Sequence, residues 1–151
     1  MDKPCVNQME LHPHFQQPDF FRFLVDRDIL PVGYAPLGSP SRPERDRRKD
    51  DTTPLKDPIL MEIADRLGIS TAELCIKWAV QRGQIPIPMS INRDHYLKNL
   101  KVVTTKPLSK DDMKKIMKID KNCRLIKGQV FLWENAKDWT DLWDLDGNIK
   151  Q

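Results

Sequence analysis

Short apolar runs alternate with longer amphipathic stretches along the chain. The apolar runs predict β-strands over residues 5–9, 29–34 and 84–88. Apolar positions at helical spacing predict α-helices over residues 20–28, 58–67, 71–82, 92–100 and 110–120. A helical stretch follows each strand, and this order is typical of βα units that build a parallel sheet.

Polar and glycine residues mark the ends of the predicted helices. Ser70 and Glu73 have the spacing of a capping box, and Ser109 and Asp112 repeat it. These pairs predict where two of the helices begin. The other end signals are Asp19, Pro58 and Asn92 at helix starts and Gly68 and Gly83 at helix ends.

Two of the predicted helices have apolar residues that we expect to face the core. They are Leu74, Cys75, Trp78 and Val80 in one helix and Met113, Ile116 and Met117 in the other. In the third predicted strand, Pro86 and Pro88 have no backbone N–H group, so they cannot donate hydrogen bonds to a neighbouring strand.

Two long segments have no predicted regular structure. Residues 35–57 form a polar loop that contains several prolines, and a loop of this length in a compact domain is usually functional or disordered. Residues 123–151 form a tail with three of the four tryptophans, namely Trp133, Trp139 and Trp143. We expect this tail to pack against the body of the domain or to present an exposed apolar surface.

The composition indicates one soluble domain of 151 residues, with 39% hydrophobic and 31% charged residues. The net charge of +3 is too small to indicate nucleic acid as a partner. Three cysteines without a CxxC pair favour a reducing compartment. No apolar run reaches the roughly 20 residues that a membrane helix needs, and the N-terminus lacks the apolar core of a signal peptide. We therefore expect a cytoplasmic protein that does not bind a membrane.

Candidate binding residues lie where the predicted strands end. Ligand groups gather at the carboxyl ends of parallel strands. Those ends are Gln8, Tyr34 and residues 88–90. The segment APLGSP, which is stiffened by its prolines, follows Tyr34 directly and suits a binding surface at the end of a strand.

Several of these residues also have ordinary structural explanations. Taken alone, Tyr34 would be a half-buried strand tyrosine. His12 and His14 lack a third ligand at a useful spacing, so a loop turn is favoured and no metal is predicted. Ser90 and Asn92 fit a helix cap, and an anion site at the same helix N-terminus is compatible with that role.

Four stretches, in order along nearly the whole chain, resemble the aldo-keto reductase superfamily. VNQMELHP at 6–13 is similar to the VNQ-x-E-x-HP strand of the family, and VGYAPLGSP at 32–40 is similar to its TAYSPLGSP segment. AELCIKWAVQRGQIPIPMS at 72–90 is similar to its helix and IPKS strand, and DKNCRLI at 120–126 resembles the stretch before its variable tail. The PMS variant and the tail resemble the fungal glycerol dehydrogenase and glyceraldehyde reductase branch.

The resemblance implies an α/β fold of the (β/α)8 TIM-barrel family. This chain would be an incomplete barrel with about three parallel βα units and a C-terminal tail. Residues 1–122 would be the C-terminal part of the barrel, and residues 123–151 would line the substrate side. The implied activity is NAD(P)H-dependent reduction of an aldehyde or ketone to an alcohol, with the nicotinamide cofactor and a small carbonyl substrate as partners.

The resemblance also implies contacts to the cofactor. Tyr34 would stack on the nicotinamide ring, and Gln8 would hydrogen-bond its carboxamide. Leu37 and Ser39 would contact the pyrophosphate, with the 35–57 loop folded over it as a belt. The residues implied at the adenosine end are Ser90, Ile91, Asn92, His95, Lys98 and Asn99.

Two positions depart from the family pattern where the cofactor's 2′-phosphate is recognised. Met89 replaces a lysine that pairs with this phosphate, and His95 replaces the usual arginine. Methionine has no hydrogen-bond donor, and neutral histidine is a weak charge partner. Arg93 and Lys98 are near enough along the helix to compensate. NADP (as NADPH) is therefore the expected cofactor, and NAD remains an alternative.

The catalytic Asp, Tyr, Lys and His of the family come from earlier strands of the barrel. The two tyrosines of this chain, Tyr34 and Tyr96, match the nicotinamide-stacking position and the adenosine-side helix instead. We therefore assign no catalytic residue and expect the chain alone to be inactive. A complementing N-terminal half is the expected partner. The alternative is a non-catalytic nucleotide-binding or scaffold module that another chain completes.

Overall fold

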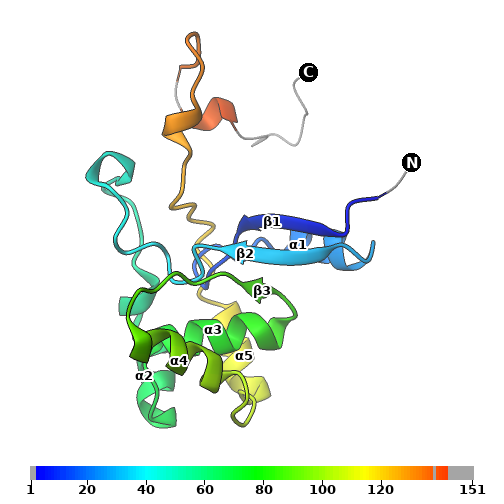
Figure 1. Cartoon of the computed structure of the whole chain (residues 1–151), viewed down its shortest axis with the longest axis vertical. Helices are drawn as coiled ribbons and strands as arrows, with labels where there is room; N and C mark the ends of the chain where they lie inside the picture. Colours follow the sequence, from blue (N-terminus) through cyan, green and yellow to red (C-terminus); the bar gives the residue numbers. More distant parts are fainter. Residues whose placement is uncertain (1–2, 138, 143–151) are drawn as a thin grey trace.

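The computed structural model describes residues 3–137 and 139–142 (Figure 1). Within these residues the strands are β1 (Val6–Glu10), β2 (Leu30–Tyr34) and β3 (Ile85–Pro86). The α-helices are α1 (Pro18–Val25), α2 (Pro58–Leu67), α3 (Thr71–Arg82), α4 (Arg93–Val102) and α5 (Lys110–Met117). Short 3₁₀ turns are η1 (Glu44–Asp46), η2 (Pro54–Lys56), η3 (Gln129–Phe131) and η4 (Trp139–Leu142). No helix in this part of the chain is long and apolar enough to cross a membrane.

The three strands form one parallel sheet in the order β1-β2-β3. Val6 of β1 pairs with Leu30 of β2, and Val32 of β2 pairs with Ile85 of β3. The sheet is open, with β1 and β3 as its edges. The predicted α/β fold with parallel βα units is therefore confirmed. An open sheet of three strands is only part of a closed barrel.

Strand β3 is shorter than the predicted 84–88 segment. It consists of Ile85 and Pro86 alone. Pro86 and Pro88 cannot donate to a ladder, and the backbone N–H of Ile87 makes a last bond to the carbonyl of Gly33 at 2.9 Å. Gln84 lies just after α3 and its cap Gly83, and its N–H donates back to the carbonyl of Ala79 in the helix.

The start of α1 differs from the prediction. Gln17, with a left-handed φ of 45°, is the N-cap, and no side chain caps this helix. Pro18 occupies the first helical position, where its missing N–H has no cost, and Asp19 lies within the first turn. The prediction of Asp19 as the cap is therefore wrong, although its charge at this end favours the helix dipole.

Several other predicted helix ends are confirmed, but α1 ends at Val25 rather than at Asp28, and α5 ends at Met117 rather than at Asp120. Both capping boxes form, between Ser70 and Glu73 and between Ser109 and Asp112. The three further confirmed signals are Asn92 as the N-cap of α4, Gly68 after α2 and Gly83 after α3. Replacing such an N-cap residue by alanine typically lowers stability by about 1 kcal/mol. These local signals therefore help to fix where the helices begin.

The apolar core has two parts. The larger part lies between α2, α3 and α5 and contains Leu60, Ile63, Ala64, Leu74, Cys75, Trp78, Ala79, Leu108 and Ile116. The smaller part lies between the sheet and α1 and contains Met9, Leu11, Leu24 and Ile29. Arg82 joins the two parts, since its guanidinium lies 4.1 Å from the ring of Phe21 and 5.3 Å from the ring of Trp78.

Two residues predicted to face the core are exposed instead. Val80 is 42% exposed and Met117 is 60% exposed. Val80 lies two positions after Trp78, and this spacing turns it to a different side of the helix. Met117 follows Ile116 directly at the end of α5 and points away for the same reason. Met113, by contrast, packs at the edge of the core as predicted.

His14 connects the β1–α1 loop to two distant segments. Its Nε2 lies 2.8 Å from Oδ2 of Asp57, and its side chain is buried. Asp57 in turn caps α2 by accepting from the backbone N–H of Ile59. The carbonyl oxygen of His14 accepts from the backbone N–H groups of Lys121 and Cys123 at 3.2 and 3.0 Å. One buried histidine thus holds the start of α2 and the beginning of the tail.

The protonation of His14 should make the stability of the fold depend on pH. Burial lowers the pKa of His14 from its ordinary value of 6.5, and its hydrogen bond to Asp57 opposes this shift. Below about pH 6.5 the unfolded chain therefore binds more protons than the folded chain. We expect the free energy of unfolding, measured in urea, to be constant just above that pH and to decrease as the pH falls below it.

A His14→Gln variant is the matched control, because its amide can still donate to Asp57 but does not titrate. The buried His12 and the exposed His95 remain in both proteins. The variant should lose less stability than the unaltered chain between about pH 7 and about pH 5. An identical pH dependence in both proteins would show that His14 does not control it.

Candidate functional site

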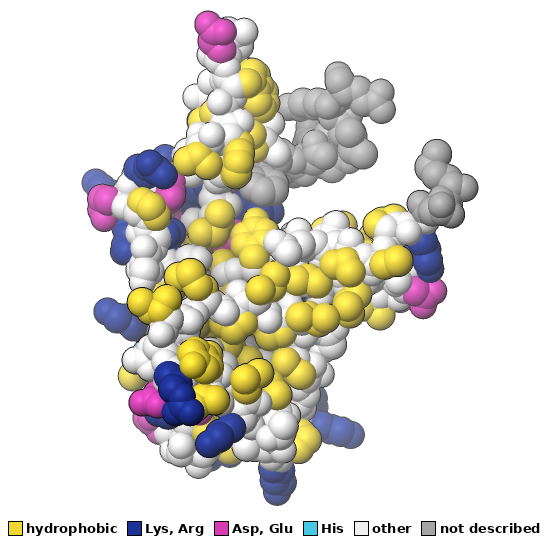
Figure 2. All heavy atoms as spheres, in the orientation of Figure 1, with side chains coloured by type: hydrophobic (Ala, Val, Ile, Leu, Met, Phe, Trp, Pro, Cys, Tyr) yellow, Lys and Arg dark blue, Asp and Glu magenta, His cyan; other side chains and the backbone are white. Residues whose placement is uncertain are grey.

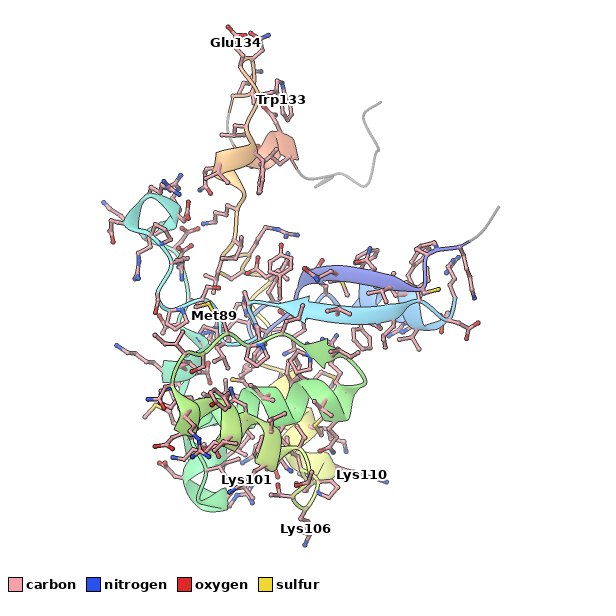
Figure 3. All side chains as sticks on the ribbon, in the orientation of Figure 1. Met89, Lys101, Lys106, Lys110, Trp133 and Glu134 are labelled. Carbon is pink, nitrogen blue, oxygen red and sulfur yellow. The ribbon has the colours of Figure 1, made fainter. Side chains whose placement is uncertain are left out.

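A groove of about 340 Å³ lies at the carboxyl ends of β2 and β3. Residues 35–37 and 39–42, which follow β2, form one wall, and residues 87–89, which follow β3, form the other. Figure 3 shows Met89 on this second wall, on the side of the molecule where the long loop leaves β2. The parallel register brings the two walls together, because both segments leave the same end of the sheet.

The structure brings some of the predicted cofactor residues to this groove. Leu37 and Ser39 line it, and Tyr34 lies half-buried at the end of β2, just before the loop. Gln8 is exposed on β1, two residues before the end of that strand. Outside the lining, on the segment that leads into α4 and on its first turns, lie Ser90, Ile91, Asn92, His95, Lys98 and Asn99.

The backbone of the loop after β2 adopts an uncommon conformation. Ala35 has a φ of 50° and Ser39 has a φ of 44°, both in the left-handed region. Residues other than glycine rarely adopt this region, and each instance costs on the order of 1–3 kcal/mol. Such strain persists only where surrounding contacts enforce it, and it gathers at ligand-binding sites. Two strained residues within five positions therefore favour a binding role for this loop.

Gly38 lies where the loop packs against its own far end and against the tail. A Cβ atom at this position would lie 2.7 Å from Cδ of Pro54 and 3.1 Å from Cδ1 of Leu125. The φ of Gly38 is also left-handed, at 73°. No other residue fits this position without displacing its neighbours, so Gly38 sets how closely the loop approaches the tail.

A buried ion network, which we call the Asp51 clasp, closes the loop. Nη2 of Arg42 lies 2.5 Å from Oδ2 of Asp51, and Nζ of Lys127 lies 2.8 Å from Oδ1. All three side chains are at most 8% exposed. Burial alone would raise the pKa of Asp51, but the hydrogen bonds from Lys127 and Arg42 bring it below its ordinary value. The clasp therefore joins two parts of the loop, at Arg42 and Asp51, and ties them to the tail through a charged carboxylate.

Glu10 anchors the tail at the end of β1. Its side chain is fully buried, and its two oxygens accept from the backbone N–H groups of Leu125 and Ile126 at 2.8 and 3.0 Å. Nε2 of His12 lies 3.0 Å from the same carboxylate. A buried carboxylate is tolerated only when its oxygens are hydrogen-bonded, and here three donors meet this need.

Tyr34 lies beside this anchor. The side chain of Arg124 hydrogen-bonds the Tyr34 hydroxyl, and its guanidinium also lies 4.6 Å from the centre of the Phe15 ring. Burial and the charge of Glu10 raise the pKa of Tyr34, while Arg124 acts in the opposite direction. Tyr34 is therefore protonated and neutral at neutral pH.

His12 and His14, which were considered as possible metal ligands, have other partners. His12 bonds Glu10, and His14 bonds Asp57. Among the residues that the structure describes, no three His, Cys, Asp or Glu side chains come together as a metal site. The predicted loop turn is also present, since the backbones of His12 and Phe15 bond each other.

The tail leaves the body of the domain after the clasp. Figure 3 shows Trp133 and Glu134 at the tip of an excursion away from the sheet. Phe131 is 74% exposed and Trp133 is 54% exposed, so this part of the tail is the exposed apolar surface that was one of the two expectations. Trp143 and the side chain of Trp139 lie outside the described residues.

Known proteins share the sequence that builds this arrangement. The sequence profile of the Aldo/keto reductase family matches residues 2–121, which include the groove and the histidine loop. The chain belongs to the aldo/keto reductase family. No local pattern in the sequence indicated Glu10 as the anchor of the tail, and none indicated Arg42, Asp51 or Lys127.

Several aldo/keto reductases are similar to the chain over most of its length. Aldo/keto reductase slr0942 of Synechocystis is 35% identical over 142 residues, which are 93% of this chain and 43% of that protein. The NADP-dependent D-sorbitol-6-phosphate dehydrogenase of Malus domestica is 35% identical and aligns over 81% of the chain and 38% of its own length. Human aldo-keto reductase family 1 member A1 is 35% identical and aligns over 82% of the chain and 37% of its own length. The chain thus spans about two fifths of the length of these relatives.

The packing of Gly38 can be tested against a second left-handed glycine. Gly68 has a similar φ of 66°, but a Cβ atom there would meet no atom within 4 Å. We expect Gly68→Ala to lower the free energy of unfolding by about 1 kcal/mol, the cost of the left-handed backbone. Gly38→Ala should lose about 1–3 kcal/mol more, because its methyl group overlaps Pro54. Urea unfolding measures both, and equal losses would contradict the close packing of the loop.

Proposed function

We propose that this chain is the cofactor-binding, C-terminal part of an NAD(P)H-dependent aldo-keto reductase, an oxidoreductase that converts an aldehyde or ketone to an alcohol. The observation that carries this proposal is the groove between residues 35–42 and 87–89, at the strand ends where parallel sheets bind ligands. The cofactor supplies the hydride that such a reduction needs. Residues 1–122 would form part of the barrel, and residues 123–151 would form the tail on the substrate side.

Tyr34 would bind the nicotinamide ring. It is half-buried at the end of β2, and its hydroxyl is held by Arg124, so the orientation of the ring is set before a ligand arrives. A held aromatic ring loses little side-chain entropy when a flat ligand stacks on it. Gln8, on the neighbouring strand, would hydrogen-bond the carboxamide through its exposed side chain.

Leu37 and Ser39 would contact the pyrophosphate. Both line the groove, and the strained backbone between Ala35 and Ser39 lets the main chain approach a ligand closely. The Asp51 clasp keeps the rest of the loop near the groove.

The adenosine end of the cofactor would lie near the start of α4. Asn92 caps this helix by accepting from two backbone N–H groups, and Ser90 precedes it. The helix N-terminus and the charged side chains of Arg93 and Lys98 favour an anionic group. His95, although exposed, lies in the first turn of the same helix. The apple relative, named as NADP-dependent, supports NADP as the preferred cofactor.

Within residues 3–137 and 139–142, neither tyrosine is placed to protonate a carbonyl. The hydroxyl of Tyr34 is engaged by Arg124, and Tyr96 is 43% exposed on α4, among the residues proposed for the adenosine end. We therefore propose that the proton donor belongs to barrel strands absent from this chain. The PMS variant and the tail favour the glycerol dehydrogenase and glyceraldehyde reductase branch, so glyceraldehyde is the first substrate to test.

Titration of NADPH into the purified chain tests the proposal. We expect binding without consumption of NADPH when glyceraldehyde is added. Tyr34→Phe should keep most of the affinity because it keeps the ring, whereas Tyr34→Ala should weaken binding by about tenfold, or roughly 1.4 kcal/mol. No binding by the unaltered chain would refute the cofactor site, and turnover by the chain alone would refute the assignment of the proton donor elsewhere.

Met89 provides a test of cofactor preference. Its side chain is 88% exposed and has no donor for a phosphate. A lysine there would add one exposed ion pair to the 2′-phosphate of NADPH and none to NADH. Met89→Lys should thus tighten NADPH binding by up to about fivefold, since exposed pairs contribute at most about 1 kcal/mol. If NADH binding improves equally, the 2′-phosphate does not lie near residue 89.

A further inference from the structure

A second cavity, which we call the basic pocket, lies within the loop between β2 and α2. Its volume is about 300 Å³, and every residue that lines it belongs to residues 37–56. Residues 87–89, which form the second wall of the groove, do not contribute to it. Its lining includes four cationic side chains, those of Arg42, Arg47, Arg48 and Lys56. The basic pocket is therefore a separate site from the proposed cofactor groove, although part of the loop after β2 borders both.

The positive charge of the basic pocket is only partly neutralised. Its acidic lining residue, Asp51, is already paired with Arg42 and Lys127 in the clasp. Among the residues that the structure describes, no carboxylate forms a salt bridge with Arg48 or Lys56. The guanidinium of Arg48 donates to backbone carbonyl groups of its own loop instead. The charges of these two side chains are therefore available to an anionic ligand.

Two buried polar atoms of the lining residues also lack a partner. Nε of Arg42 and Oγ1 of Thr52 make no hydrogen bond to any described residue. The side chain of Arg42 is 8% exposed, so water reaches little of it. Buried donors are nearly always paired in folded proteins, because leaving one unpaired is costly. Two unpaired polar atoms on residues that line one cavity therefore favour a ligand that carries hydrogen-bond acceptors.

We propose that the basic pocket binds a small phosphate dianion, either inorganic phosphate or the phosphate group of a monoester. Arg48 and Lys56 would neutralise its charge. A guanidinium group binds such an anion well, because two of its N–H groups can donate to two phosphate oxygens at once. This inference goes beyond the proposed function and does not depend on it, since the loop forms the pocket without the groove's second wall.

The size and surroundings of the pocket favour a small ligand over a polyanion. A volume of about 300 Å³ is at the lower end of the range for small-molecule sites. A nucleic acid would need a continuous basic surface that contacts several phosphates. The loop instead carries Glu44, Asp46 and Asp50 between its cations. Figure 2 shows these opposite charges interspersed on the loop, at the left of the view.

A bound phosphate would also brace the loop. Arg42 and Asp51 already join two of its parts through the clasp. A phosphate held between Arg48 and Lys56 would add a second link between the same two parts of the loop. We therefore expect hydrogen exchange at the amides of residues 44–53 to slow when phosphate binds, because ordering of a loop suppresses its local opening.

Calorimetric titration of the full chain tests the proposal. The probes are inorganic phosphate and glycerol phosphate, added at constant ionic strength with chloride as the balancing anion. At about pH 8 a phosphate monoester carries two charges, since its second pKa is about 6. We expect saturable binding at one site for at least one of the two probes. The tighter probe identifies whether the natural ligand is the free ion or a phosphorylated small molecule.

Two pairs of matched variants assign the binding to the pocket. Arg48→Gln and Lys56→Gln should each weaken phosphate binding by about threefold to fivefold, the range expected for one exposed ion pair. Arg45→Gln and Lys49→Gln remove the same charge from the same loop but lie outside the lining, so they should bind as the unaltered chain does. All four side chains are exposed, and the circular dichroism spectra should therefore match.

Three outcomes would overturn the proposal. The first is that neither probe binds saturably in the presence of chloride. The second is an equal loss of phosphate binding in all four variants, which would indicate a general effect of charge. The third is a parallel loss of NADPH and phosphate binding in Arg48→Gln and Lys56→Gln, which would make the pocket part of the cofactor site. Failure of the unaltered chain to bind NADPH, with phosphate binding intact, would refute the proposed function and support a separate phosphate site.

Discussion

The buried carboxylate of Glu10 is the interaction on which the site depends. Its oxygens accept from the backbone of Leu125 and Ile126, so the chain must return to the end of β1 after its last helix. That return places Leu125 against Gly38 and directs Lys127 toward Asp51. Three donors compensate the burial of one charge, and the loop after β2 is consequently enclosed by a segment more than seventy residues further along the chain.

The loop after β2 is shaped by contacts at its two ends rather than by its own sequence. Ala35 and Ser39 are strained, and the chain between them approaches Pro54 so closely that Gly38 has no room for a side chain. Arg42 and Asp51 join the two ends of the loop, with a buried ion pair that would be costly to leave half-formed. The tail meets this loop at two places, since Leu125 lies close to Gly38 and Lys127 pairs with Asp51.

Local signals in the sequence predicted most of the helix ends and the order of the strands. Capping boxes such as Ser70 with Glu73 act over one turn, so they are visible without the fold. Asp19 failed as a cap because Pro18 and the left-handed Gln17 already start the helix. Contacts between distant segments were not predictable, since Asp51 with Lys127 and His14 with Asp57 have no periodic spacing. The family motifs implied cofactor contacts for Tyr34 and Ser39 but could not reveal the clasp behind them.

The two halves of the proposed enzyme have different physical requirements. The groove, the strained loop and the ring of Tyr34 are held by contacts within this chain, and most of them involve buried polar groups with partners. On the face of the sheet opposite α1, by contrast, Val6, Leu30 and Ile85 are 48%, 40% and 50% exposed, although Val32 on the same face is buried. Hydrophobic surface of this kind contributes to stability only when something covers it. The groove is therefore held by contacts within this chain, whereas the exposed apolar side chains of the sheet contribute to stability only when another surface covers them.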